Sequence, residues 1–413
     1  MSSTISQTAS LLKGLMSNLM SADNDVRTHA ENSLKTEWVA TQPQTLLSSL
    51  AFLVHQDTEP QARAFAAVLL RRIAFQNAPN AEYKEDERSV WSIVGPAVQQ
   101  AVMGELLGAL KDETDRSARH KLCDTISEVN NEVGDDEWAE LLPALYACAQ
   151  NGDALLRESA YRIFASCAYL LTGQSVEAIA SAFIGAFQDS DAAVRLAALK
   201  AAVAYVLAAS EKQRGAAAAM VPQMLSVLEP LLRDGDEAGL VEALSALIEA
   251  AEEAPKLFRA VLGSLIPFAT EIGKNAGLES TTRQTALEVL VTLAEAAPGM
   301  CRKHAQFSQS IVPVCLQMMS TIEDDEDWYA TDAIEEGDNE EDHVFGEQTL
   351  DRLAIALGGK QLLPIAFNYI PQMLASGEWR QRHAALMAVS SIGEGCYKIM
   401  RGELQKILEL IVP

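Results

Sequence analysis

Residues 59–70 read EPQARAFAAVLL, so that Glu59, Arg63, Ala66 and Leu70 follow one another at intervals of four, three and four residues. In an α-helix the arginine, the alanine and the leucine share one face, and the small alanine lets a neighbouring helix approach closely. An acid just before such a helix meets the free N–H groups of the first turn and the positive end of the helix dipole. The pattern predicts a helix that begins near Glu59.

The same pattern recurs along the chain. Its arginines are Arg27, Arg63, Arg119, Arg157, Arg195, Arg283 and Arg382. The acids four residues earlier are Asp23, Glu59, Asp115, Asp153, Asp191, Glu279 and Glu378. Six of the seven arginines have an alanine three residues later, and all seven have an apolar residue seven residues later. Amphipathic stretches precede several of these helices, at residues 44–54, 96–110, 140–149, 176–187 and 256–272. Each unit is therefore predicted to be a helical hairpin.

The spacing of the units identifies the repeat type. Successive arginines are 36, 56, 38, 38, 88 and 99 residues apart, and the gap of 88 holds a degenerate unit around residues 235–254. A period near 40 residues made of two antiparallel helices is typical of HEAT repeats. We therefore predict an all-α fold, a right-handed superhelical solenoid of about nine to ten HEAT repeats that is continuous over residues 1–413. Because the apolar pattern still runs at Ile411 and Val412 without a polar cap, we expect this to be the N-terminal part of a longer array.

Composition and charge restrict the function classes. The chain has 413 residues, of which 49% are hydrophobic and only 6% aromatic, as expected for packed helices and not for a disordered chain. With 32 Lys and Arg against 57 Asp and Glu, the net charge is −25. Such a surface repels phosphate backbones and anionic lipids, so we expect no direct nucleic-acid or membrane partner and favour basic proteins. The sequence shows neither a secretory signal nor a continuous apolar window of membrane-spanning length.

A search for catalytic and metal-binding motifs finds none. The segment Gly358-Gly359-Lys360-Gln361 lacks the upstream glycine and the hydroxyl of a phosphate-binding loop. The close pair Cys301 and His304 offers too few ligands for a metal, and no nucleophile elbow is visible. The six cysteines form no C-x-x-C pair and are interpreted as buried thiols in a reducing compartment. We therefore predict no enzyme, no cofactor and no metal site.

Residues 323–342 contain 12 acids and no lysine or arginine. Self-repulsion should prevent this stretch from folding alone, so it is predicted to be an acidic loop inserted between the two helices of one repeat. Two interpretations remain open: the loop only increases solubility, or it binds or screens a basic partner.

The ordered set of motifs resembles one family. The set comprises residues 25–31 (DVRTHAE) with Trp38, residues 62–73 (ARAFAAVLLRRI), 119–124 (RHKLCD), 157–163 (RESAYRI), 254–258 (APKLF), 350–354 (LDRLA) and 378–382 (EWRQR). In this order, with the acidic stretch before the last two, the motifs resemble the importin-β (karyopherin-β) transport receptors, and most of all their importin-5 branch.

The resemblance implies a nuclear import receptor. Members of the family bind basic nuclear localisation signals of cargo proteins such as ribosomal proteins or histones, contact Phe-Gly nucleoporins in the nuclear pore, and release cargo on binding Ran-GTP. A monomer that shuttles between cytoplasm and nucleus is implied. The repeats and the acidity equally fit a static HEAT-repeat scaffold or adaptor subunit, and GTP-dependent partner binding would discriminate between the two.

The resemblance also implies contact residues. For Ran they are Glu31, Lys35, Arg71, Arg72, Asp124 and Glu128. In the acidic loop they are Asp324, Asp325, Glu326, Asp327 and Trp328. For cargo they are Asp351 and Glu394, with a pair to a neighbouring arginine and an ordinary surface acid as the respective alternatives. For nucleoporins they are Phe183, Phe187 and Leu225, for which ordinary inter-repeat core is the alternative.

Overall fold

A computed structural model describes residues 2–78, 88–134, 138–322 and 341–412. Within these residues every regular element is a helix, apart from one antiparallel bridge between Asn77 and Ser89. The predicted all-α class and its helical repeats are confirmed. The chain divides into two compact units, residues 1–174 with 193–205 and residues 175–192 with 206–413, and each is described by itself.

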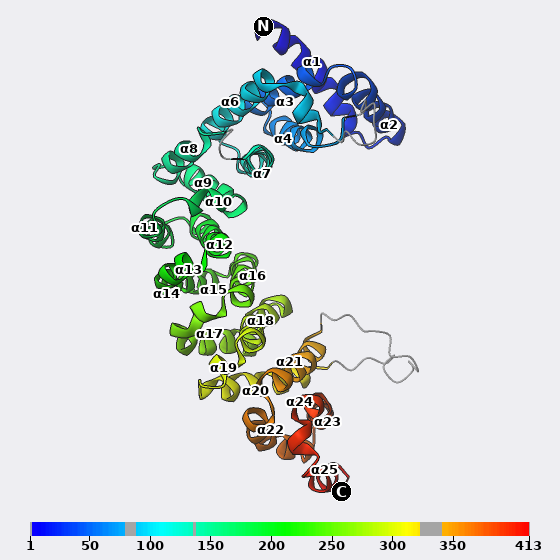
Figure 1. Cartoon of the computed structure of the whole chain (residues 1–413). Helices are drawn as coiled ribbons and strands as arrows, with labels where there is room; N and C mark the ends of the chain where they lie inside the picture. Colours follow the sequence, from blue (N-terminus) through cyan, green and yellow to red (C-terminus); the bar gives the residue numbers. More distant parts are fainter. Residues whose placement is uncertain (1, 79–87, 135–137, 323–340, 413) are drawn as a thin grey trace. The chain divides into compact units, whose positions relative to one another are not determined.

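Unit 1 is a series of stacked helix pairs (Figure 1). Its helices are α1 (Ser2–Leu19), α2 (Asn24–Ser33), the π-helix η1 (Leu34–Val39), α3 (Pro43–Gln56), α4 (Pro60–Ala74), α5 (Val90–Val94), α6 (Pro96–Asp112), α7 (Arg116–Val133), α8 (Leu141–Ala149), α9 (Ala154–Ser166), α10 (Tyr169–Thr172) and most of α12 (Ala192–Ala208). Helices α3 and α4, and α8 and α9, pack together across short turns, as hairpins do. Between repeats, α3 packs on α6, and α7 packs on both α4 and α9. First helices therefore stack on first helices, and second helices on second helices.

Unit 2 repeats this arrangement (Figure 1). Its helices are α11 (Val176–Ala186), α13 (Glu211–Ala217), η2 (Ala218–Met220), α14 (Val221–Leu225), α15 (Leu228–Asp234), α16 (Glu237–Glu253), η3 (Pro255–Ala260), α17 (Leu262–Lys274), α18 (Ser280–Ala296), α19 (Pro298–Cys301), α20 (Gln306–Met319), α21 (Asp342–Leu357), α22 (Gly359–Leu374), α23 (Trp379–Ser391), α24 (Gly393–Met400) and α25 (Leu404–Ile411). Helices α17, α20 and α22 form one row, and α16, α18 and α21, followed by α23 and α24, form the other. The stretch 256–272, read from the sequence as one amphipathic stretch, is two helices, η3 and α17.

The acids of the repeated motif precede the second helices, as predicted. Asp23, Asp115 and Asp153 are N-cap residues whose carboxylates accept hydrogen bonds from backbone N–H groups of α2, α7 and α9. Glu59 and Glu378 occupy the same position before α4 and α23 without a side-chain capping bond. The extra methylene of glutamate places its carboxylate beyond the geometry that aspartate reaches.

The repeated arginines have a role that the motif alone did not reveal. Five of them fold back over the preceding turn and donate to the backbone carbonyl six residues earlier: Arg27 to Ser21 at 2.7 Å, Arg63 to Asp57 at 2.9 Å, Arg157 to Asn151 at 2.9 Å, Arg382 to Ser376 at 2.8 Å, and Arg119 to Glu113. These carbonyls lie in interhelical turns, where a backbone acceptor lacks a helical partner. In these five repeats the arginine therefore ties the turn to the helix that follows it.

The alanines of the motif lie on the buried faces of their helices. Ala30, Ala66, Ala160, Ala198, Ala286 and Ala385 are all buried. The predicted close approach of neighbouring helices at these positions is thus consistent with the structure. The six cysteines, Cys123, Cys148, Cys167, Cys301, Cys315 and Cys396, are also buried and unpaired, as interpreted from the sequence.

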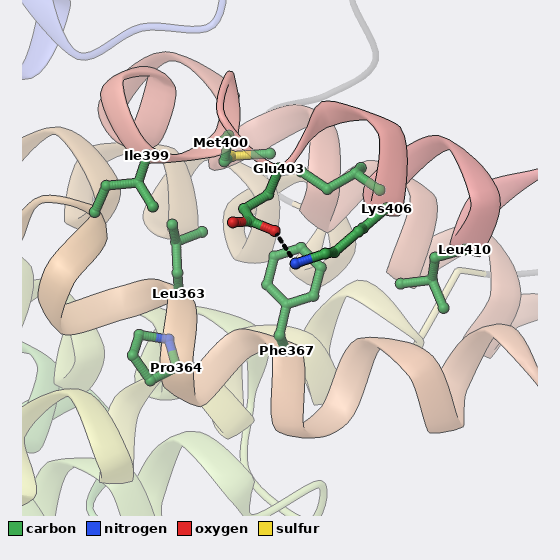
Figure 2. A pocket seen from close by; sticks show the side chains of 9 residues that line it. Leu363, Pro364, Phe367, Ile399, Met400, Glu403, Lys406 and Leu410 are labelled. Carbon is green, nitrogen blue, oxygen red and sulfur yellow. Dashed lines mark ion pairs between the residues drawn. The ribbon is translucent and has the colours of Figure 1, made fainter.

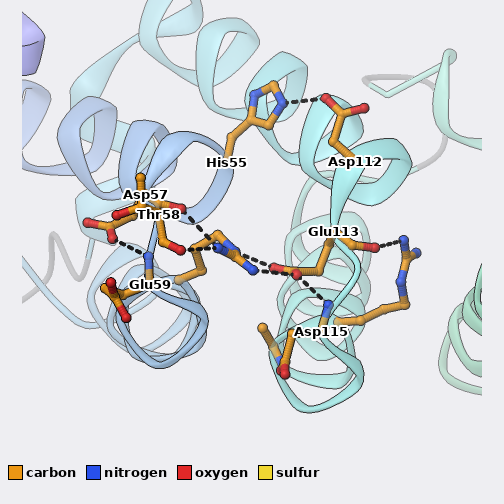
Figure 3. Close-up of polar contacts among 10 residues, drawn as sticks. His55, Asp57, Thr58, Glu59, Asp112, Glu113 and Asp115 are labelled. Carbon is orange, nitrogen blue, oxygen red and sulfur yellow. Dashed lines mark hydrogen bonds and ion pairs between the residues drawn. The ribbon is translucent and has the colours of Figure 1, made fainter.

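The turns of neighbouring repeats in unit 1 are joined by polar contacts (Figure 3). Arg63 on α4 donates through Nε and Nη2 to the two carboxylate oxygens of Glu113, which follows α6, at 2.6 and 2.7 Å. Glu113 also accepts a hydrogen bond from the backbone N–H of Asp115 at 2.8 Å. Beside them, His55 of α3 lies 2.7 Å from Glu105 and 3.0 Å from Asp112, both on α6. These contacts fix the stacking of the α3–α4 pair on the α6–α7 pair.

One helical stretch of the described chain, residues 211–234, is long and apolar enough to cross a membrane by length and composition alone, with a mean hydropathy of 1.3. It consists of α13, η2, α14 and α15, which pack on α11 and α16. The stretch is thus broken into short helices that pack on neighbouring helices of unit 2, and it also carries Glu211, Lys212 and Arg214.

Candidate partner-binding surfaces

A groove lies between the α2–η1 segment and α4 in unit 1, with a volume of about 600 Å³. Glu31 on α2, Lys35 on η1 and Arg72 on α4 line it, and all three side chains are exposed. Phe65 and Val68 belong to its apolar lining. Three of the residues predicted to contact Ran are therefore brought together around one hollow.

The other three predicted residues lie on α4 itself and on the neighbouring second helix α7. Asp124 of α7 stands between Arg71 of α4, at 3.9 Å, and Arg162 of α9, at 3.5 Å, and each of these side chains is about one-third exposed. Glu128 lies one turn after Asp124 on the same helix and is exposed. Sequence reasoning missed Arg162, although Arg162 belongs to the 157–163 motif. Loose, solvated pairs of this kind contribute at most about 1 kcal/mol each, so their members can exchange partners readily.

The two acids predicted to bind cargo also lie close together, in unit 2. Asp351 is on α21 and Glu394 is on α24, and these helices pack side by side (Figure 1). Burial, followed by the nearby Glu394 carboxylate, raises the pKa of Asp351. Among the described residues neither acid has an ion pair, so the alternative of Asp351 paired with a neighbouring arginine is not what the structure shows. The arrangement is an acidic pair open to an external cation.

The arginine next to Asp351 is already fully engaged. Arg352 donates to Glu288 at 2.7 and 2.8 Å and to Glu295 at 2.7 and 2.9 Å, both on α18. These bonds hold the pKa of Arg352 above its ordinary range despite burial. One turn before Asp351, burial raises the pKa of Glu347 as well. The sequence analysis did not single out Glu347 as a further acid near Asp351, because this glutamate belongs to no recognisable motif.

The acidic loop residues Asp324, Asp325, Glu326, Asp327 and Trp328 lie outside the described residues. The helices on either side, α20 and α21, pack against each other. Asp342, which the sequence analysis included in the acidic stretch, is the first residue of α21, is 9% exposed and forms an ion pair with Arg283 of α18. The charge of Asp342 is therefore neutralised by an arginine of the same chain.

The predicted nucleoporin residues need a correction. Phe183 on α11 is 2% exposed and Phe187, which follows this helix, is 1% exposed; their rings stack with centroids 6.2 Å apart. Neither ring is available to a partner, because both are buried in the interior. This agrees with the alternative interpretation, in which the two rings belong to the ordinary core between repeats. Leu225, at the end of α14, is half-buried.

A second hollow, of about 430 Å³, lies between α22 and the α24–α25 segment. Figure 2 shows Leu363 and Phe367 of α22 below Met400, with Leu410 to the right. Glu403 and Lys406 form an ion pair of 2.5 Å beside them. Its lining is almost entirely apolar. No residue predicted from the sequence lines it.

The fold and these surfaces define a helical-repeat protein equipped to bind other proteins. Family models described as "Importin repeat" and "IPO5-like, TPR repeats" match residues 275–364 and 114–268. Importin subunit beta-3 of Saccharomyces cerevisiae is 35% identical over 95% of this chain and 36% of its own length. The probable importin-5 homolog of Dictyostelium discoideum is 23% identical over 95% of this chain and 36% of its own length. The chain belongs to the importin-β (karyopherin-β) family.

Solved structures give the same result. The crystal structure of Kap121p is 33% identical, with a TM-score of 0.83 over 99% of this chain and 39% of that protein. Kap121p bound to RanGTP matches with 33% identity and a TM-score of 0.82 over 100% of this chain and 38% of the other. Kap121p has also been solved bound to Nup53p and to Pho4p. The present chain thus spans little more than a third of the relatives it matches.

Proposed function

We propose that this chain is part of a nuclear transport receptor that binds basic nuclear localisation signals, crosses the nuclear pore through nucleoporin contacts and releases cargo on binding Ran-GTP. The observation that carries the proposal is the match of the entire chain, at a TM-score of 0.82, to a karyopherin solved with RanGTP. A receptor of this kind shuttles between cytoplasm and nucleus and acts by binding alone, without catalysis.

The Ran contact is assigned to the second helices of unit 1. The groove offers Glu31, Lys35 and Arg72 as exposed charges beside an apolar surface. Next to it, Asp124 lies 3.9 Å from Arg71 and 3.5 Å from Arg162, so both ion pairs are loose. A protein partner can replace these weak pairs with shorter, charge-assisted hydrogen bonds at little cost. The acidic residues 324–328 remain a predicted second contact.

The cargo contact is assigned to Asp351 and Glu394. Two carboxylates that repel each other are stabilised when an ammonium group enters between them. The lysine of a basic signal supplies that group, and partial burial of Asp351 strengthens the resulting bond. The nucleoporin contact involves neither Phe183 nor Phe187.

The Ran assignment is tested by calorimetric titration of this chain with Ran loaded with a non-hydrolysable GTP analogue, beside Ran-GDP. Preference for the GTP form is expected, with weaker binding by K35E/R72E. The control K212E/K360E makes the same charge change at exposed lysines of unit 2 and should bind as the unmodified chain does. Equal binding of the GTP and GDP forms would favour the static scaffold instead.

The cargo assignment is tested by fluorescence anisotropy with a labelled lysine-rich peptide. D351N/E394Q should bind at least about tenfold more weakly, since two charge-assisted contacts are lost. The control E252Q/E253Q removes two exposed acids from α16 and should change affinity little. If both variants lose affinity equally, binding follows only the overall negative charge and the assigned pair is wrong.

A further inference from the structure

A basic cleft opens on unit 2 between the η3–α17 segment and the turn after α18. Its volume is about 630 Å³. Lys256 and Arg259 of η3 line one side, Lys303 and His304 line the other, and Leu262 and Met300 are among its apolar lining residues. The first side is formed where η3 ends and α17 begins. Phe258 of η3 is buried there, whereas Lys256 and Arg259 of the same helix are exposed.

The charge of this cleft is opposite to that of the chain. Four basic side chains and no acid line it, whereas the net charge of the chain is −25. Elsewhere in unit 2, the exposed Lys274 has an acidic partner, Glu271, at 2.9 Å. Among the described residues, Lys256, Arg259 and Lys303 have no ion pair. Cations concentrated in a concavity without counter-charges attract an anionic ligand.

The size and the apolar lining indicate what kind of anion fits. A volume of about 630 Å³ is far larger than a single phosphate or carboxylate and lies in the range of pockets that hold a drug-sized ligand. Leu262 and Met300 give the ligand an apolar surface between the two basic sides. A short peptide with acidic and apolar residues uses both features, because its carboxylates reach the cations while an apolar side chain covers the lining.

We propose that this cleft binds an acidic peptide segment of a partner protein. Arg259 offers a carboxylate two parallel hydrogen bonds, and Lys256 and Lys303 supply further charge from opposite sides. The site is separate from the surfaces assigned to Ran and to basic cargo, and it selects ligands of the opposite charge. This chain would thus hold a basic peptide and an acidic peptide at different places on unit 2.

The test is fluorescence anisotropy of the whole chain with a labelled octapeptide that alternates aspartate or glutamate with leucine or phenylalanine. K256Q/K303Q should bind about tenfold more weakly, because each exposed charge pair changes affinity several-fold. The control K212Q/K360Q removes two exposed lysines of the same unit that also have no ion pair among the described residues. It should retain the original affinity, and thermal melts of both variants should coincide.

Three results would overturn the proposal. The first is equal affinity of the cleft variant and the control variant, or no binding of the peptide at all. The second is undiminished binding of the peptide in which every acid is replaced by its amide, which would make the contact purely apolar. The third is displacement of the peptide by an equimolar concentration of inorganic phosphate, which would make the cleft a simple anion site.

Discussion

Arg63 and Glu113 lie 50 residues apart in the sequence and share two hydrogen bonds, of 2.6 and 2.7 Å, across the contact between successive repeats (Figure 3). Their side chains are only 14% and 3% exposed. Burial by itself would raise the pKa of Glu113, but the hydrogen bonds from Arg63 and from the backbone outweigh burial and lower the pKa. The pair is thus a buried, fully hydrogen-bonded link between two turns.

Removing one partner of this link should destabilise unit 1 strongly. We expect R63A to lower the free energy of unfolding by about 3–5 kcal/mol, because it leaves the Glu113 charge buried without its partner. Urea denaturation followed by circular dichroism measures the change. The matched control is R233A, since Arg233 pairs with Asp234 at 3.0 Å in an exposed position, and it should have almost no effect. Similar losses for both variants would contradict a special role for the buried pair.

His55 should make the contact between α3 and α6 sensitive to pH. Burial lowers the pKa of His55, but hydrogen bonds and the charges of Asp112 and Glu105 outweigh burial and raise the pKa above 6.5. A group whose pKa is raised by folding stabilises the fold fully below its unfolded pKa, and this stabilisation is lost as the pH rises through the folded pKa. The difference in unfolding free energy between the unmodified chain and H55Q should therefore be largest near pH 5 and shrink above about pH 7. A difference that is constant from pH 5 to pH 8 would contradict the raised pKa.

Ala198 tests the close packing of second helices. It is completely buried on α12, so a phenylalanine there must displace its neighbours. We expect A198F to destabilise unit 1 by about 1–3 kcal/mol through overpacking, seen as a lower melting temperature. The control A182F places the same ring at an exposed position of α11 and should leave the melting temperature nearly unchanged.

The cysteines should be unreactive in the folded chain. Burial raises the pKa of Cys123, Cys167 and Cys396 to about 11 and that of Cys301 and Cys315 to about 12, and it also raises the pKa of Cys148. At pH 8 a disulfide reagent should modify no thiol rapidly until denaturant is added, when all six become reactive. The S245C variant, with a thiol on the exposed face of α16, should react with one equivalent at once.

The repeated acid–arginine–alanine motif predicted much of the fold, because the start of a helix and its buried face depend on residues that are close together in the sequence. An acid four residues before an arginine places a helix start, and an alanine three residues after it fixes the buried face, as at Asp153 and Ala160. The π-helix η1 was not predicted, because the segment from Leu34 to Val39 has no distinctive composition. The arginine-to-carbonyl bonds were also missed, since they depend on the conformation of a turn rather than on residue type.

The candidate sites show where such reasoning succeeds and where it stops. Asp351 and Glu394 are 394 − 351 = 43 residues apart, close to one repeat, so the period alone favours their proximity. Phe183 and Phe187 are four residues apart and therefore share a helix face. The sequence of one helix does not show whether a neighbouring helix covers that apolar face or leaves it exposed. The basic cleft escaped notice because Lys256 and Lys303 are distant in sequence and belong to no repeated motif.

The bonds from the motif arginines to the turns before them have a consequence for proteolysis. Interhelical turns are the places where a protease usually cuts a helical-repeat protein, because the enzyme needs several residues of extended chain in its cleft. Here the carbonyl groups of Ser21, Asp57, Asn151 and Ser376 are each held by a guanidinium group, so those turns cannot extend without breaking that bond. A protease should therefore leave these four turns intact as long as their repeats remain folded, and cleavage there would report the unfolding of a repeat.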